Sequence, residues 1–387
     1  MFDEKLRRIK DDGLYRQMKY LQSPQGARVR IANHDMLMLS SNSYLGLCAD
    51  ESLKQAARDA LERYGAGSGG SRLTTGSYEI HQKLEEEIAA FKGTTAALVF
   101  NTGYMANVGV ISAIANHDWT IYSDRLNHAS IIDGCRLSGA RIVVYDHCDA
   151  EDLAQRIKND PGKKRMIITD GLFSVDGDIA PLPSLTGIAR QHGALLMVDE
   201  AHATGVLGPH GGGAADHFGM TEGIDISIGT LSKALASEGG FVTGSRALID
   251  YLVNTARSFI FSTALSPATV AVSLAALDIV RTQPQRREAL LAHSLWLRQS
   301  LRKARFDVAD HPTPIVSVVL GSPDLAVTFS EALMKQNIFV SAIRPPTVPP
   351  GTSRLRINLM ATHDREDLKR ALSCITDIGR ELGVIGA

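Results

Sequence analysis

Short apolar runs alternate with amphipathic segments through the middle of the chain. Segments 50–63 and 80–92 have the spacing of charged and apolar residues that is typical of helices. Runs rich in Val, Ile and Leu lie at 96–101, 119–123, 141–145, 165–170, 194–200, 225–230 and 239–244. Apolar runs of this length, separated by helices, predict an α/β fold. Its large domain is expected to hold a mostly parallel seven-stranded sheet, buried on both faces by flanking helices.

The pattern changes after about residue 284. A charged helical stretch at 285–304 is followed by apolar runs at 314–320, 337–343 and 354–359, and by helical segments at 324–336 and 364–383. This order predicts a smaller α+β domain over 284–387, after a large domain over 51–283. Residues 1–50 are expected to pack beside the small domain and to enter the large one, because 36–41 has the composition of a strand.

Composition excludes several classes of protein. The 387 residues are 44% hydrophobic and carry a net charge of −1, so no electrostatic feature favours nucleic acid or an anionic membrane. The four cysteines lack metal-binding spacing and fit a reducing compartment. The charged start resembles no secretory signal, and Pro267 and Asp278 interrupt the apolar run 264–280, which is expected to be a buried helix. We expect a cytoplasmic protein.

Three short motifs suggest functions that their context disfavours. Residues 65–70 match G-x-G-x-x-G, but a charged helix precedes them where a dinucleotide site needs a strand. Asp199-Glu-Ala-His202 resembles a helicase box, yet the sequence has no phosphate-binding G-x-x-x-x-G-K-[ST] loop. As metal ligands, Asp199 and His202 lack a third residue at suitable spacing. We therefore expect no metal, nicotinamide nucleotide or nucleic acid.

Polar residues follow the predicted strands at the point where each strand ends. Open α/β sheets bind ligands beyond the carboxyl ends of their strands, so these side chains are expected to share one crevice. The candidates are His128, Ser174, Asp199, His202, Thr230 and Lys233.

Lys233 stands among small and apolar residues, in GTLSKALASEGGF (229–241). Burial lowers the pKa of such a lysine and makes its amine nucleophilic, which suits an enzyme that uses pyridoxal 5′-phosphate (PLP). Asp199 suits the pyridine nitrogen of that cofactor, and either His128 or His202 suits its ring face or its phenolic oxygen. The backbone of Gly103-Tyr104, at a predicted strand-to-helix turn, suits the phosphate.

The motifs together identify a family resemblance that covers nearly the whole chain. They are SSNSYLGL (40–47), GSGGSR (67–72), NTGYMAN (101–107), DRLNHASIIDG (124–134), DGLFSVDGDIAPL (170–182), VDEAHATGVLG (198–208) and GTLSKA (229–234). In this order they resemble the α-oxoamine synthases, PLP enzymes of fold type I that condense an amino acid with an acyl thioester. The resemblance implies the same fold, cofactor and reaction class.

The resemblance also implies a role for each matching residue. Lys233 would hold PLP as a Schiff base and later move the α-proton, while Asp199 would pair with the ring nitrogen. His128 would stack on the ring, and His202 and Ser174 would bond its phenolic oxygen. The phosphate would be held by Thr230, by the backbone of Gly103 and Tyr104 and, from a second subunit, by Ser262 and Thr263. A homodimer with shared sites is the expected assembly.

The segment 341–357, SAIRPPTVPPGTSRLRI, resembles the branch of this family that joins L-alanine to a pimeloyl thioester in biotin synthesis. The acyl carrier in that branch would be coenzyme A or an acyl-carrier protein. Arg356 would bind the carboxylate of the amino acid as a bidentate pair. Further candidates for contact with substrate are Asn42, Thr347, Arg344 and Arg16, the last of which is equally well explained as a surface arginine.

Other functions stay open. Residues 14–26 (LYRQMKYLQSPQG) also resemble glycine C-acetyltransferases, which use glycine and acetyl-CoA, and family members of broad acyl specificity. A non-catalytic relative is disfavoured because Lys233, Asp199 and His128 are all present.

Overall fold

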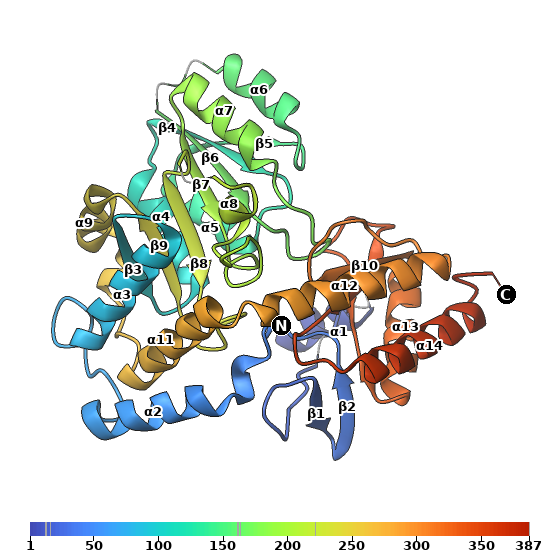
Figure 1. Ribbon diagram of the computed structural model, residues 1–387. Helices are drawn as coiled ribbons and strands as arrows, with labels where there is room; N and C mark the ends of the chain where they lie inside the picture. Colours follow the sequence, from blue (N-terminus) through green and yellow to red (C-terminus); the bar gives the residue numbers. More distant parts are fainter. Residues whose placement is uncertain (12–13, 16, 161, 163, 221, 387) are drawn as a thin grey trace.

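The computed structural model describes residues 1–11, 14–15, 17–160, 162, 164–220 and 222–386. Its centre is a seven-stranded sheet of order β3–β9–β8–β7–β6–β4–β5 (Figure 1). The strands are β3 (Ala96–Phe100), β4 (Trp119–Asp124), β5 (Arg141–Tyr145), β6 (Lys164–Asp170), β7 (Leu195–Asp199), β8 (Ile226–Thr230) and β9 (Gly240–Gly244). β9 is antiparallel to β3 and β8, whereas each remaining neighbouring pair is parallel. The predicted mostly parallel sheet is confirmed.

Helices cover both faces of this sheet, because successive side chains of a strand point to opposite sides. Leu98 and Ile168 belong to one apolar core, and their neighbours Val99 and Ile167 belong to the other. The first core is closed by α4 (Gly103–Ile114), α5 (Ala129–Ser138), α9 (Arg246–Thr255) and α10 (Arg257–Ile260). The second is closed by α2 (Glu51–Tyr64), α3 (Glu79–Lys92), α6 (Ala150–Lys158), α7 (Leu182–His192), α8 (Ala214–His217) and α11 (Pro267–Thr282).

The carboxyl-terminal part is a small antiparallel sheet with three helices on it. The sheet has the order β10–β13–β12, with β10 (Ile315–Gly321), β12 (Ser341–Ile343) and β13 (Ser353–Asn358). Its helices are α12 (Gln285–Lys303), α13 (Pro323–Lys335) and α14 (Arg365–Glu381). β13 is the middle strand of this sheet, which fixes the positions of Arg354 and Arg356.

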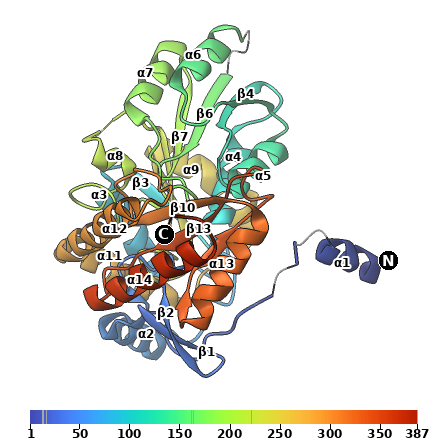
Figure 2. The same cartoon turned by 90° about the vertical axis from the view of Figure 1, so that its right-hand side faces the viewer.

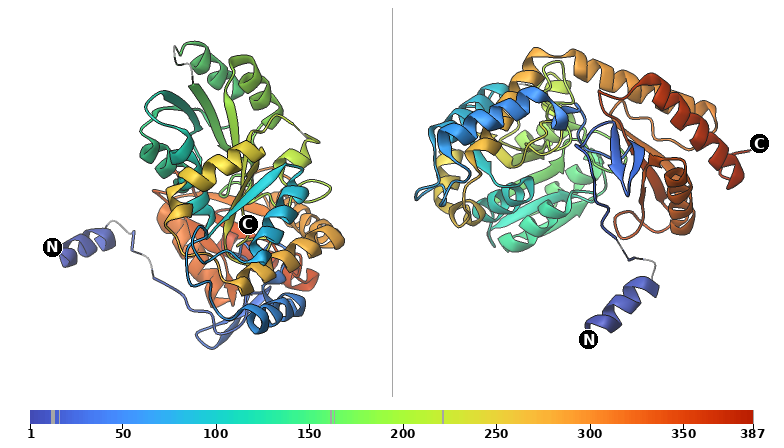
Figure 3. Two further views of the ribbon diagram at one scale, coloured as in Figure 1. Left: turned by 90° about the vertical axis from the view of Figure 1, so that its left-hand side faces the viewer. Right: turned by 90° about the horizontal axis from the view of Figure 1, so that it is seen from below.

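A third sheet joins the start of the chain to this part (Figure 3). It contains β1 (Arg28–Ile31), β2 (His34–Met38) and β11 (Ile338–Phe339), and β2 pairs with β11 in parallel. The predicted strand at 36–41 thus ends at Met38 and joins this outer sheet instead of the central one. The predicted strand at 337–343 is two short strands, because the chain leaves β2 at Phe339 and pairs with β13 from Ser341.

Two further segments complete the described chain. A 3₁₀ turn, η1 (Leu47–Ala49), leads into α2. The first helix, α1 (Phe2–Asp11), has no buried residue and lies away from the rest of the molecule (Figure 2). Within the described residues, no helix has both the length and the apolar character needed to cross a bilayer.

Candidate active site

A cavity of about 220 Å³ lies at the carboxyl ends of β6, β7 and β8, beside the first turn of α4. It brings together the predicted residues Gly103, Tyr104, His128, Ser174, Asp199, His202, Thr230 and Lys233. Its other lining residues, which the sequence did not single out, are Thr102, Asn107, Ser130, Asp170, Ala201 and Ser232. The expectation that polar strand ends share one crevice is therefore met for these residues.

Lys233 lies just beyond β8 in this cavity. Burial lowers the pKa of Lys233 to about 8, although the nearby carboxylates of Asp199 and Asp170 act in the opposite direction. An amine with such a pKa is partly unprotonated near neutral pH and can attack a carbonyl carbon.

Two carboxyl groups of unlike surroundings face this lysine from neighbouring strands. Asp199 ends β7, and its Oδ1 accepts a hydrogen bond of 2.8 Å from the Ala201 N–H. Asp170 ends β6, and burial together with the charge of Asp199 raises the pKa of Asp170 well above its usual range. Burial and the neighbouring Asp199 thus both oppose ionisation of Asp170, so the two carboxyl groups of the cavity are not equivalent.

His128 is held by its own helix. Its Nδ1 lies 2.7 Å from Ser130 Oγ and accepts from the Ser130 N–H at 3.3 Å, and its backbone N–H donates to Asp170 Oδ2 at 2.9 Å. Burial lowers the pKa of His128, so the ring is neutral. With Nδ1 as acceptor, the ring proton sits on Nε2.

His202 has a partner that the sequence did not reveal. Its Nδ1 lies 2.7 Å from the hydroxyl of Tyr44, a fully buried residue of the SSNSYLGL motif. Burial raises the pKa of Tyr44 to about 12 and lowers the pKa of His202 well below its usual range. The phenol therefore donates to a neutral imidazole, which leaves the His202 Nε2–H free for a ligand.

One end of the cavity is built to receive an anion. The side chain of Thr102 caps α4, so the N–H groups of Gly103 and Tyr104 are left for a ligand at the positive end of the helix. A Cβ on Gly240 would lie 2.5 Å from Gly103 Cα, so glycine is needed for this close approach. The hydroxyls of Thr230 and Ser232, 2.7 Å apart, lie beside the same turn.

Arg356 and Asn42 lie together but do not line this cavity. Arg356 Nη2 donates to Asn42 Oδ1 at 3.2 Å, and Asn358 Nδ2 donates to the same oxygen at 2.9 Å. The Nε of Arg356 is enclosed without a hydrogen-bond partner among the described residues. An incoming carboxylate would satisfy it, since guanidinium groups favour bidentate pairing with carboxylates.

A second cavity, of about 660 Å³, adjoins the first through Ser174, which lines both. Its walls are mostly apolar and include Leu126, Ile132, Phe173 and Val348. Thr347 is also among its lining residues. An extended acyl chain matches this shape and polarity.

Besides Asn42 and Arg356, which line neither cavity, four predicted residues lie outside both cavities or outside the described chain. Arg344 is half-buried, and its Nη2 donates to the backbone oxygen of Tyr15 at 3.2 Å. Thr263 pairs with Ser71 and accepts from Asn101, and neither Thr263 nor its neighbour Ser262 lines the cavity of this chain. Arg16 lies outside the described residues.

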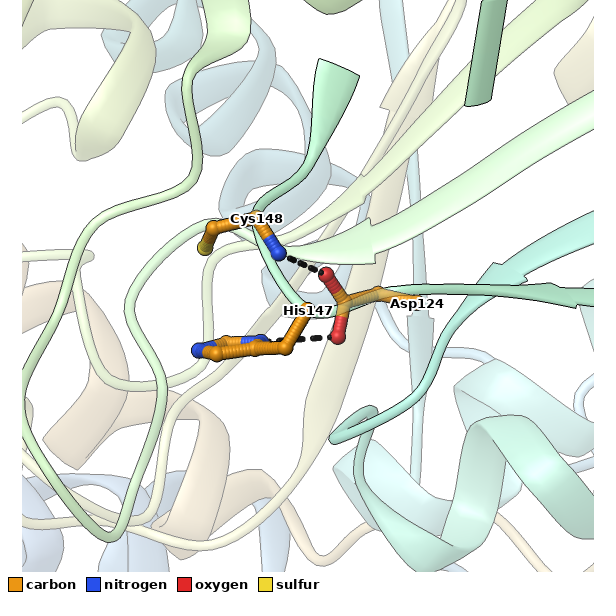
Figure 4. A group of neighbouring side chains, drawn as sticks. All are labelled: Asp124, His147 and Cys148. Atoms are coloured by element: carbon orange, nitrogen blue, oxygen red, sulfur yellow. Dashed lines mark hydrogen bonds and ion pairs between the residues drawn. The ribbon is translucent and has the colours of Figure 1, made fainter. Parts of the chain in front are cut away.

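One group away from these cavities has ligand types that metals use (Figure 4). Asp124, His147 and Cys148 gather at the ends of β4 and β5. Both ring nitrogens of His147 are already hydrogen-bonded to carboxylates, Nδ1 to Asp124 and Nε2 to Asp178. An imidazole bound in this way offers no lone pair to a metal, so the group is better described as an ion-pair cluster.

The donors of the first cavity fit PLP. An amine is available for its aldehyde, a fixed carboxylate for its ring nitrogen and a helix start for its phosphate. The sequence profile described as aminotransferase class I and II matches residues 34–375. The chain belongs to this family.

Within the aminotransferase family, the chain is similar over nearly its full length to several curated proteins. The 8-amino-7-oxononanoate synthase of Lysinibacillus sphaericus is 48% identical over 385 residues, 99% of each chain. The protein of the same name from Geobacter sulfurreducens is 49% identical over 383 residues, 98% of each chain. The predicted resemblance is confirmed.

Solved structures of the aminotransferase family confirm the fold. Serine palmitoyltransferase from S. paucimobilis, with a bound PLP–myriocin aldimine, is 32% identical with a TM-score of 0.94, covering 99% of this chain and 98% of that one. The 8-amino-7-oxononanoate synthase from Francisella tularensis is 30% identical with a TM-score of 0.78, covering 89% and 98%.

Proposed function

We propose that the protein binds PLP and condenses L-alanine with a pimeloyl thioester, releasing CO₂ and free thiol and forming 8-amino-7-oxononanoate for biotin synthesis. The observation that carries this proposal is the placement of Lys233 and Asp199 in one cavity, in a chain about half identical to full-length proteins named for that product. The reaction takes place in the cytoplasm, where thiols such as the four free cysteines of this chain stay reduced.

PLP, when bound, supplies an electron sink for the carbanion that forms at the α-carbon of the amino acid. Lys233 would hold the cofactor covalently through its Nζ, and the same nitrogen would take and return the α-proton of the amino acid. Asp199 would keep the proton of the ring nitrogen in place. His128 would lie against the ring face, and His202 Nε2–H and Ser174 Oγ would bond the phenolic oxygen.

The remaining groups bind and orient. The N–H groups of Gly103 and Tyr104 would hold the phosphate, and the hydroxyl of Thr230 would join them by turning from Gly239 O, to which it donates at 2.8 Å. Arg356 holds the alanine carboxylate, with Asn42 fixing the guanidinium. The apolar cavity beyond Ser174 takes the acyl chain and excludes water from the carbanion.

The protein acts as a homodimer in which each subunit completes the site of the other. Ser262 and Thr263 are the residues offered to the partner, because they do not line the cavity of their own chain. The acyl group arrives on coenzyme A or on an acyl-carrier protein.

The test is a CO₂-release assay over a matrix of amino acids and acyl thioesters. L-Alanine with pimeloyl-CoA or pimeloyl-acyl-carrier protein is expected to turn over fastest, and the ratio of the two identifies the carrier. Lys233→Ala is the control and should lose both turnover and the visible absorbance of the loaded protein. A preference for glycine with acetyl-CoA would assign the protein to the glycine C-acetyltransferases instead.

A further inference from the structure

Asn107 is a buried amide that contacts the key carboxylate of the cavity. It lies on α4, is 1% exposed, and its Nδ2 donates to Asp199 Oδ2 at 2.6 Å. The other oxygen of this carboxylate accepts from the Ala201 N–H. Both oxygens of Asp199 are therefore fixed, and the carboxylate cannot rotate without breaking a hydrogen bond.

The same Nδ2 makes a second hydrogen bond, to Ser130 Oγ at 2.9 Å. Because Ser130 Oγ accepts from Asn107, its own proton is directed to His128 Nδ1, 2.7 Å away. A continuous chain of hydrogen bonds thus runs from Asp199 through Asn107 and Ser130 to His128. It joins the carboxylate that would pair with the ring nitrogen to the imidazole that would lie on the ring face.

An amide is the appropriate donor for this position. A lysine or arginine would also bond Asp199, but its charge would cancel the anion that the ring nitrogen needs. An amide N–H orients the carboxylate and leaves its net charge unchanged.

We propose that Asn107 is a positioning residue, which holds the Asp199 carboxylate toward the ring nitrogen of the cofactor and, through Ser130, fixes the orientation of the His128 ring. The inference rests on the proposed function, since it assigns Asn107 to the same PLP site. Asn107 acts on the reaction through Asp199 and not by touching the reacting carbon.

The experiment compares the PLP dissociation constant, kcat and the KM for L-alanine in wild type and Asn107→Leu. Loss of a hydrogen bond to a charged group is expected to weaken PLP binding and lower kcat by about 10- to 100-fold each, with KM for alanine within about twofold. Asn107→Asp, which keeps the shape but replaces the donor with an acceptor, is expected to show the same loss if Asn107→Leu does not fold.

Two further comparisons separate this role from simple packing. In an Asp199→Asn background, Asn107→Leu should lower PLP affinity and kcat by no more than about twofold. The hydrogen bond between residues 107 and 199 that it removes is already altered in that background. Ser112→Ala is the matched control, since its hydroxyl bonds Val108 O on the same helix outside the cavity. It should change the melting temperature of the apoprotein without changing PLP affinity.

Each outcome has a distinct meaning. A wild-type protein that takes up no PLP overturns the proposed function, and this inference with it. Wild-type uptake with PLP affinity and kcat unchanged in Asn107→Leu overturns the inference alone. Equal losses in the wild-type and Asp199→Asn backgrounds would also overturn it, because Asn107 would then act independently of Asp199.

Discussion

Lys233 shows how one environment sets both the charge and the reactivity of a side chain. Its ammonium form is disfavoured by burial and favoured by Asp199 and Asp170, and burial is the larger effect. With a pKa of about 8, the amine is mostly protonated below that pH and mostly free above it.

The rate at which the apoprotein takes up PLP should follow this titration. Only the unprotonated amine attacks the aldehyde, so the rate is expected to rise with pH through about 8 and then level off. With a lysine exposed to water, the rate would continue to rise until the pH approached the ordinary lysine pKa of about 10.4. Stopped-flow absorbance across this range measures the midpoint, and Lys233→Ala provides the baseline. A midpoint near that of free lysine would contradict the assigned environment.

At this scale the sequence predicted the groups that we propose for the chemistry, but not the neighbours that hold them. Lys233 and Asp199 were found because an amine and a carboxylate at buried strand ends are costly unless they pair with each other or with a ligand. Asn107 belongs to the motif NTGYMAN (101–107) and Tyr44 to SSNSYLGL (40–47). A buried amide or phenol is nevertheless common in protein cores, so neither residue signals a role by itself. Only the contacts with Asp199 and His202 reveal what these two residues hold.

At the scale of elements, an ionised histidine joins two strands to the loop that carries Ser174. His147 follows β5 and is hydrogen-bonded to Asp124 at the end of β4 and to Asp178 in that loop. The ring of Phe173 packs edge-on against it, with centroids 4.4 Å apart. Burial alone would lower the pKa of His147, but the two carboxylates raise it to about 12.

His147→Gln should therefore destabilise the protein in a pH-dependent way. The folded-state pKa lies above the unfolded value of about 6.5, so the stabilisation is complete below that pH and is lost as pH rises toward 12. Urea unfolding near pH 6 should show that the variant has lost about 2 kcal/mol of its free energy of unfolding. This difference from wild type should be smaller at about pH 9. His117→Gln is the control, because that side chain is 87% exposed. A difference that does not vary with pH would refute the charged form.

The secondary structure was predicted well where local pattern decides it. β3, β8 and β9 are short runs in which every residue is buried, and such runs can be predicted without knowledge of their partners. The run at 337–343 looked like one strand, because its division depends on pairing with β2 and β13, far away in sequence. Long-range pairing leaves no signal in a short apolar window.

At the scale of the whole molecule, the residues of the proposed site come from three distant parts of the chain. Asn42 comes from the amino-terminal segment, Lys233 from the turn just beyond β8 and Arg356 from the small sheet. The Asn358 N–H bonds Leu39 O at 2.8 Å, which ties the first of these parts to the last. Ser262 and Thr263, the two predicted phosphate ligands from a second subunit, do not line the cavity of their own chain.

Mixed dimers test whether those two residues serve the partner. Lys233→Ala is combined with a Ser262→Ala/Thr263→Val subunit after co-expression. If sites are shared, each heterodimer has one site with both defects and one with neither. About a quarter of all sites should then regain tight PLP binding and turnover at low PLP. If each chain supplies its own phosphate ligands, every site keeps one defect and the mixture stays as weak as its parents. Each variant purified alone provides that baseline, so recovery above it can come only from an intact site built by two chains.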